Sequence, residues 1–130
     1  NKTPFDRLKR RNQTRSTLLM NIFSWLPFGK VPEVTSTQLN TRKNNFQMID
    51  VRTTAEFQAD HIDSAVNLPI TQFSRQALQR LELDPEKPVV AICLSAHRSI
   101  PAVRHLRDLG FDAYQLAGGM KAWWRYQKTR

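Results

Sequence analysis

An apolar run of five residues, Pro88-Val89-Val90-Ala91-Ile92, constrains the fold more than any other part of the sequence. A strand without a polar face has to be covered on both sides, which is typical of a central strand in a parallel sheet with helices on both faces. The run leads directly to Cys93, the only cysteine of the 130-residue chain. We therefore expect the single thiol at the carboxyl end of a central strand.

Short apolar runs alternate with helical patterns along the rest of residues 31–130, which is typical of a βαβ series. Ser36 or Thr37 is the expected cap of the first helix, and the Thr53-x-x-Glu56 spacing predicts a capping box at the start of the second. The expected strands are residues 34–35, 46–51, 65–68, 88–92 and 113–116, and the expected helices run to about residue 43, from about residue 53, and over 73–81, 100–109 and 120–126. The pattern predicts an α/β fold, with a parallel sheet of about five strands flanked by helices on both faces.

The positive charge is concentrated at the start of the chain. Residues 1–15 carry six basic side chains against Asp6, whereas residues 31–130 carry 13 basic against 10 acidic side chains, within a total charge of +9. A basic arm of this kind is most often a solvated tail, and contacts with anionic lipid or nucleic acid are the alternatives. Because the body of the protein is nearly balanced, we expect no nucleic-acid binding.

An apolar stretch, residues 17–28, follows the basic arm and is interrupted by Asn21, Ser24 and Pro27. It is too short to span a bilayer, and no small-residue cleavage site of a secretory signal follows Phe28. It can form an interfacial helix that makes weak contact with an anionic membrane, or dock on its own domain or on a twin chain, and docking is the favoured alternative. We accordingly divide the chain into an N-terminal basic and apolar extension, residues 1–30, and one domain, residues 31–130.

The segment after the central strand has the composition of an anion-binding loop. Its sequence is Cys93-Leu94-Ser95-Ala96-His97-Arg98-Ser99. Ligands of open α/β sheets bind at the carboxyl ends of the strands, and a loop that leads into a helix presents backbone N–H groups to an anion. Helix N-termini and neighbouring cations favour the thiolate form of a cysteine. The loop is therefore predicted to hold a Cys93 thiolate.

Arg98 is the cation expected to act with Cys93. Its guanidinium remains charged, and its planar fork matches an oxyanion such as thiosulfate. The alternative is that Arg98 pairs with a surface carboxylate and has no part in the chemistry.

Several separated motifs, in order along residues 32–125, are similar to the rhodanese homology domain. They are Ile49-Asp50-Val51-Arg52, Ala55-Glu56-Phe57, His61-Ile62, Ala65-Val66-Asn67-Leu68-Pro69, the loop 93–99, and Leu116-Ala117-Gly118-Gly119-Met120 followed by Trp123. The resemblance implies a single-domain sulfurtransferase of the thiosulfate type, with a rhodanese-like fold.

The resemblance also implies the roles of individual residues. Cys93 and Arg98 would be the catalytic residues, with Cys93 the covalent persulfide carrier. Asp50 and Arg52 would lie near the loop and steady it, although a purely structural role for them and for Glu56 is an equal alternative. His61 is expected to form structural hydrogen bonds. The residues expected to bind the substrate are Leu94, Ser95, Ala96, His97 and Ser99, of which Ser95 and His97 would shape the entrance.

The loop length separates sulfur from phosphate chemistry within this resemblance. Cys93 and Arg98 form Cys-x4-Arg, the length that resembles sulfurtransferases, whereas related phosphatases and arsenate reductases use Cys-x5-Arg. Ala96 departs from the pattern because many members have glycine there, and at a positive φ an alanine costs about 1 kcal/mol. Asp60 and Asp63-Ser64 replace the more usual glycine and Pro-Gly of the family around His61 and Ile62, which affects turn geometry more than chemistry.

The implied partners are thiosulfate or another sulfane-sulfur donor, and a small thiol, cyanide or a protein thiol as acceptor. No metal and no cofactor is expected. A single cysteine excludes an intrachain disulfide, which favours a cytoplasmic setting, with a peripheral membrane location as an addition. The main alternative function is a non-catalytic rhodanese-like binding or sensor module, since a fold alone does not establish activity. A further alternative makes residues 1–30 the main functional element, at a membrane surface.

Overall fold

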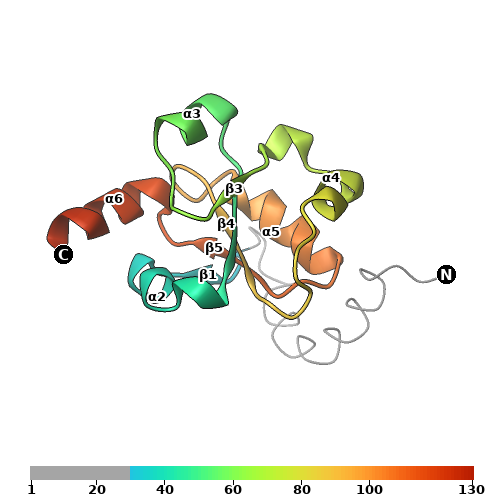
Figure 1. The fold of residues 1–130 in the computed structure, drawn as a ribbon, viewed down its shortest axis with the longest axis horizontal. Helices are drawn as coiled ribbons and strands as arrows, with labels where there is room; N and C mark the ends of the chain where they lie inside the picture. The colour runs from blue at the N-terminus through green and yellow to red at the C-terminus, as the bar shows by residue number, and fades with distance from the viewer. Residues whose placement is uncertain (1–29) are drawn as a thin grey trace.

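The computed structural model describes residues 30–130, and the basic arm and apolar stretch of residues 1–28 lie outside the described residues. Figure 1 shows strands and helices following one another along the chain, as the sequence predicts. The strands are β1 (Glu33–Val34), β2 (Gln47–Asp50), β3 (Val66–Asn67), β4 (Val89–Ile92) and β5 (Ala113–Leu116). The helices are α2 (Ser36–Thr41), α3 (Thr54–Ala59), α4 (Arg75–Arg80), α5 (Ser99–Asp108) and α6 (Gly119–Thr129), and 3-10 turns cover Lys43–Asn45 and Ile70–Gln72.

The five strands form one parallel sheet in the order β1-β5-β4-β2-β3. β4 is the central strand, and its Ala91 lies opposite Ile49 of β2 and Gln115 of β5. Since all strands point the same way, their carboxyl ends meet at one edge of the sheet. The loop after β4 lies at this edge, where the sequence predicts the site.

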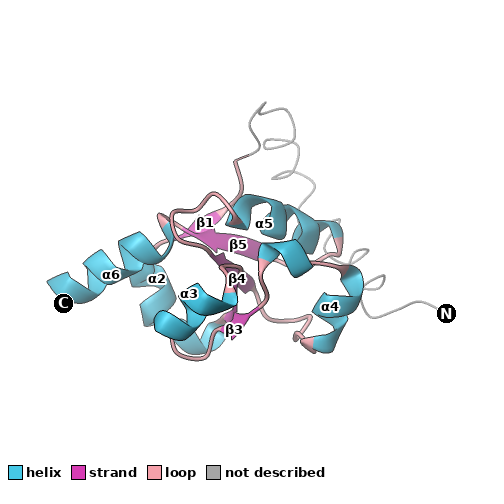
Figure 2. Ribbon diagram, turned by 90° about the horizontal axis from the view of Figure 1, so that it is seen from above, coloured by secondary structure: helices cyan, strands magenta, loops and turns pink. Residues whose placement is uncertain are grey.

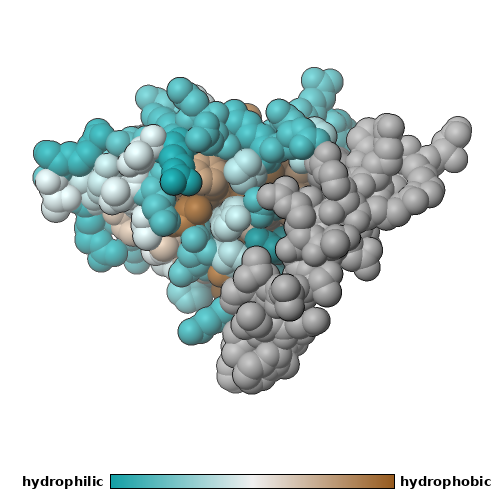
Figure 3. Space-filling model, turned by 90° about the horizontal axis from the view of Figure 1, so that it is seen from below, coloured by the Kyte–Doolittle hydropathy of each residue, from teal (hydrophilic) through white to brown (hydrophobic). Residues whose placement is uncertain are grey.

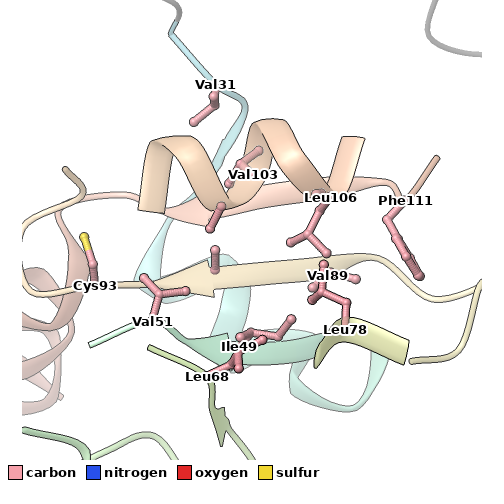
Figure 4. Packing of buried hydrophobic residues seen from close by; sticks show 13 residues of the cluster. Val31, Ile49, Val51, Leu68, Leu78, Val89, Cys93, Val103, Leu106 and Phe111 are labelled. Atoms are coloured by element: carbon pink, nitrogen blue, oxygen red, sulfur yellow. The ribbon is translucent and has the colours of Figure 1, made fainter. Parts of the chain in front are cut away.

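Helices cover both faces of the sheet. Every residue of β4 is therefore buried, which explains why all of them are apolar. Figure 2 shows α4 and α5 on one side, and α2, α3 and α6 on the other. Val89 and Ala91 face α5 and pack with Val103 and Leu106, as Figure 4 shows for the labelled members of this cluster. Val90 and Ile92 face the other way. They belong to a second cluster with Leu39, Met48, Leu116, Met120 and Trp123.

The observed boundaries differ from the sequence predictions mainly at helix ends. Thr35, not Ser36 or Thr37, caps α2: its hydroxyl accepts from the Gln38 N–H and the Gln38 side chain accepts from the Thr35 N–H. The sequence pattern instead places Thr35 in a strand, where a capping box is not expected. The capping box of Thr53 and Glu56 on α3 is confirmed.

The described residues on the face shown in Figure 3 are largely hydrophilic, with smaller hydrophobic areas between them. Among residues 30–130, Val66 is the one large hydrophobic side chain that is exposed, at 42%. No helix in this part of the chain has the length and apolar character needed to cross a bilayer.

Candidate active site

Cys93 lies immediately beyond β4, as predicted, and Figure 4 shows its sulfur at the end of that strand. The residue is only 1% exposed. Its loop runs from the end of β4 to Ser99, the first residue of α5. Because the first N–H groups of a helix have no intrahelical acceptor, the start of α5 favours negative charge in this loop.

The start of α6 holds the base of the loop. The Met120 N–H donates to the Cys93 carbonyl at 2.8 Å, and the Lys121 N–H donates to the Leu94 carbonyl at 3.1 Å. Gly119 makes this approach possible, since a Cβ at its position would collide with the Cys93 carbonyl oxygen and the Leu94 main chain. Gly119 also has a positive φ of 61°. The sequence predicts a turn at Gly118-Gly119, but its contact with the cysteine loop was missed.

Arg98 forms a bidentate ion pair with Glu56 of α3. Its Nη1 and Nη2 atoms donate to Glu56 Oε1 and Oε2 at 2.7 and 2.9 Å. Hydrogen bonding from Arg98 lowers the pKa of Glu56 to about 2, with smaller support from Thr53. The same hydrogen bond raises the pKa of Arg98, and the charges of Cys93 and Asp50 add to this effect. Arg98 therefore lies within electrostatic reach of Cys93, but its fork is directed to a carboxylate.

A chain of hydrogen bonds leads from Cys93 away from the loop. Cys93 Sγ lies 3.4 Å from Ser99 Oγ, and Ser99 Oγ donates to Gln115 Oε1 at 2.7 Å. Gln115 Nε2 in turn donates to Glu33 Oε2 at 2.8 Å. Ser99 and Gln115 are buried, and Glu33 is exposed on the edge strand β1. The sequence names Ser99 as a loop residue, but it carries no signal for Gln115 and Glu33.

The middle of the loop is more open than its ends. Leu94, Ser95 and Ala96 are half-buried, His97 is exposed, and the Ser95 hydroxyl lies 3.1 Å from His97 Nδ1. Ala96, which stands where many family members have glycine, has a positive φ of 69°. This backbone conformation is strained for an alanine. The part of the loop that solvent reaches is therefore formed by Leu94, Ser95, Ala96 and His97, and their role as a substrate entrance stays a prediction.

Asp50 and Arg52 form a buried ion pair at the end of β2. Arg52 Nε and Nη2 donate to Asp50 at 3.0 and 2.8 Å, and Nη2 also donates to the Asp60 carbonyl at 2.6 Å. The pair therefore joins the end of β2 to the end of α3. It supports the loop indirectly, since the intervening Val51 N–H donates to the Ile92 carbonyl, one residue before Cys93.

His61 has the structural role expected of it. Its Nδ1 lies 2.8 Å from the Phe57 carbonyl oxygen, and its ring stacks on the Phe57 ring at 3.8 Å between centroids. These two contacts stabilise the turn that follows α3.

Similarity to known proteins covers most of the described chain. Residues 34–126 match the family described as the rhodanese-like domain. The thiosulfate sulfurtransferase GlpE of Shewanella oneidensis is 34% identical over 87 residues, which cover 64% of this chain and 80% of that protein. The tRNA sulfurtransferase of Desulfurococcus amylolyticus is 31% identical over 102 residues, 78% of this chain and 20% of that protein.

Solved structures give the same result at the level of the fold. The thiosulfate sulfurtransferase of Pseudomonas aeruginosa superimposes with a TM-score of 0.68 at 25% identity, over 75% of this chain and 19% of that one. The chain spans about a fifth of the length of the tRNA sulfurtransferase and of the Pseudomonas aeruginosa protein that it matches. Together with the parallel five-stranded sheet and the cysteine loop at its carboxyl edge, the match over residues 34–126 shows that the chain belongs to the rhodanese-like domain family.

Proposed function

We propose that this rhodanese-like domain is a sulfurtransferase that carries sulfane sulfur as a persulfide on Cys93. The observation that carries the proposal is the position of the thiol, between the end of β4 and the start of α5, with Arg98 five residues further along the loop. The names of similar proteins, which include thiosulfate sulfurtransferases and a tRNA sulfurtransferase, support the same class of reaction.

With thiosulfate as donor, the Cys93 thiolate attacks the outer sulfur. A bond forms between Sγ and that sulfur, the sulfur–sulfur bond of thiosulfate breaks, and sulfite leaves with the electron pair. A nucleophilic acceptor such as cyanide or a thiol then attacks the outer sulfur of the persulfide and releases the Cys93 thiolate. Covalent catalysis of this kind divides the transfer into two displacements.

The loop stabilises the negative charge of both half-reactions. Backbone N–H groups at the start of α5 and the Arg98 guanidinium bind the donor and the leaving sulfite. The entrance is formed by Leu94, Ser95, Ala96 and His97. The Ser99 hydroxyl contacts the Cys93 sulfur. The buried pair of Asp50 and Arg52 holds the end of the neighbouring strand β2 in place.

Glu56 occupies the two-pronged face through which Arg98 would bind an anionic donor. One N–H of each terminal nitrogen donates to the carboxylate in the present structure, so thiosulfate has to displace Glu56 in order to use this pair of donors. The ion pair therefore restrains the residue that binds the donor. This makes Glu56 the first position at which to test the mechanism.

The physiological acceptor belongs to the class of thiophilic nucleophiles, which includes small thiols, cyanide and protein thiols. A reducing, cytoplasmic compartment suits a catalyst with one thiol and no intrachain disulfide partner. Residues 1–30, by virtue of their basic and apolar composition, either dock on an apolar surface of this domain or of a twin chain, which is the favoured alternative, or make weak, salt-sensitive contact with anionic membranes.

Intact-protein mass spectrometry after incubation with thiosulfate tests the proposal. We expect the mass of one added sulfur atom, which cyanide or a reductant removes. Cys93→Ser should fold normally and lose the adduct, since the exchange is nearly isosteric. An unchanged mass with several sulfane donors would contradict the proposal and favour a non-catalytic binding module.

A further inference from the structure

Three side chains connect the Cys93 thiol to an exposed carboxylate on the far edge of the sheet. Ser99 belongs to α5, Gln115 to β5 and Glu33 to β1, and each donates or accepts at 2.7 to 2.8 Å with the next. Ser99 is also the one hydroxyl shown within hydrogen-bond reach of the Cys93 sulfur among the described residues. We name these three residues, Glu33, Gln115 and Ser99, the relay.

The chemistry of the donors determines the direction of every bond in the relay. An ionised carboxylate only accepts, so the Gln115 group that faces Glu33 must be the NH₂. The carbonyl oxygen of Gln115 therefore faces Ser99, and the single Ser99 proton is donated to it. What remains on the Cys93 side is a lone pair of Ser99 Oγ, which can accept from a thiol but cannot stabilise a thiolate.

We propose that Glu33, Gln115 and Ser99 are positioning residues that orient the Ser99 hydroxyl away from the Cys93 thiolate and so restrain the nucleophile. The proposal rests on the proposed use of Cys93 as the nucleophile. When the thiol ionises, its sulfur loses the S–H donor that Ser99 accepts from and gains no side-chain donor in exchange. The thiolate then depends on the backbone N–H groups of the loop and on Arg98.

Glu33→Gln allows the relay to reverse without the loss of a hydrogen bond. A glutamine at position 33 can donate to Gln115, which lets the Gln115 amide turn over and present its NH₂ to Ser99. Ser99 then accepts from Gln115 and donates to the Cys93 thiolate. A hydrogen bond from a neutral hydroxyl to an anion is stronger than one from a thiol to a hydroxyl. The thiolate form of Cys93 is therefore stabilised relative to the thiol form.

Several charged or titratable groups lie on the elements around the Cys93 loop and have to be left unchanged in the test. They are Arg98 and His97 on its own loop, Asp50 and Arg52 on the β2 side, Glu56 on α3, which pairs with Arg98, and Lys121 at the start of α6, which contacts the loop through its main chain. None of them belongs to the relay. Replacing Glu33 also removes one negative charge, so its effect through space has to be separated from its effect through Ser99.

The test is the pH dependence of Cys93 alkylation by iodoacetamide, a neutral reagent that requires no sulfur transfer. We expect Glu33→Gln to move the pH of half-maximal rate downward and to raise the rate about threefold on the acid side of the curve. Gln115→Met, which leaves Ser99 without its acceptor, should move the curve in the same direction. Ser99→Ala combined with Glu33→Gln should give the curve of Ser99→Ala alone. Glu82→Gln removes the same charge from an exposed position in the connection between α4 and β4, and should match the wild type.

Three outcomes would overturn the relay. One is a Glu33→Gln curve that coincides with the wild-type curve. Another is a shift that persists in full in the Ser99→Ala background, because the charge of Glu33 would then act without Ser99. The third is an equal shift in Glu82→Gln. Persulfide formation from thiosulfate is measured separately by mass, so a failure of sulfur transfer with an intact alkylation response would reject the proposed function and leave the relay in place.

Discussion

Replacing Glu56 with glutamine removes the carboxylate that holds Arg98 and leaves the cap of α3 in place. The side-chain oxygen of Glu56 accepts from the Thr53 N–H at 3.0 Å, and a glutamine offers an equivalent oxygen. The chain itself contains the matched case, because Gln38 accepts from the Thr35 N–H at 2.8 Å in the capping box of α2. Effects of Glu56→Gln are therefore effects on the ion pair.

The energy of the pair follows from its geometry and its exposure. A fall in the pKa of Glu56 from 4.5 to about 2 would correspond to about 3 kcal/mol if the charge were fully shielded from water. Solvent reaches 35% of the Arg98 side chain and 30% of that of Glu56. Exposed pairs contribute about 1 kcal/mol or less, and the bidentate geometry places this pair at the upper end.

The stability difference between wild type and Glu56→Gln should depend on pH. Because the folded-state pKa of Glu56 is lowered, the contribution of the pair is complete above the unfolded value of about 4.5 and is lost as the pH falls toward about 2. We expect the variant to be less stable by about 1 kcal/mol at pH 7 and equal to the wild type only below the folded-state pKa of about 2. Urea unfolding at several pH values measures this difference.

The activity of Glu56→Gln toward thiosulfate should rise while its stability falls. If thiosulfate has to displace Glu56 from Arg98, the roughly 1 kcal/mol of the pair opposes donor binding, and its removal should raise kcat/KM for thiosulfate about fivefold at low salt. Alkylation by iodoacetamide should change less, since a neutral reagent does not need Arg98. Glu82→Gln serves as the control for charge.

A fall in kcat/KM for thiosulfate in Glu56→Gln would refute this reasoning. Glu56 would then hold Arg98 in its productive position, and the ion pair would be part of the competent site. If neither Glu56→Gln nor Arg98→Ala changed kcat/KM for thiosulfate, Arg98 would have no part in donor binding.

Four further changes probe the same site. Arg98→Lys keeps the charge but loses the fork, and should reduce thiosulfate turnover more than tenfold while slowing iodoacetamide alkylation less; equal losses would mean that Arg98 only ionises the thiol. Ala96→Gly relieves about 1 to 2 kcal/mol of strain at φ of 69° against about 0.4 to 1 kcal/mol of added backbone entropy, so thermal unfolding should occur up to a few degrees higher, and a lower Tm would contradict this. Gly119→Ala should cost about 2 kcal/mol or more in urea unfolding, because its Cβ would collide with the Cys93 carbonyl oxygen, and a neutral result would mean that the loop yields easily. Deletion of residues 1–28 should leave thiosulfate turnover unchanged, and its loss in a folded protein would place that segment in the site.

The fold could be predicted because the strands and the helices have different hydrophobic patterns in the sequence. The β4 run is apolar at every position, which requires cover on both faces, and the observed sheet supplies it. The 3-10 turns at Lys43–Asn45 and Ile70–Gln72 could not be predicted in the same way. Three residues are too few to show a period, and no side chain caps either turn.

Only those residues of the candidate site that are neighbours in the sequence could be predicted together. Cys93, Arg98 and Ser99 share one loop, and a short loop keeps them together whatever the rest of the fold does. Glu56 is 42 residues from Arg98, and Glu33 is 82 residues from Gln115. Such pairs depend on which strands and helices lie side by side, and nothing in the local pattern reports that.

These two distant carboxylates reach different residues of the loop, Arg98 directly and Ser99 through Gln115, so the loop sequence alone does not determine activity. Glu56 takes up the fork of Arg98, and in the proposed relay Glu33 turns the Ser99 hydroxyl away from the thiolate. Both restrain a group that the proposed reaction requires, from outside the seven-residue motif. Two rhodanese-like domains with the same Cys-x4-Arg loop should therefore differ in reactivity when they differ at the positions of Glu33 and Glu56. Because the two carboxylates share no partner, the effects of Glu33→Gln and Glu56→Gln on thiosulfate kcat/KM should multiply in the double variant, and a double variant no faster than the better single one would show that they act through one common step.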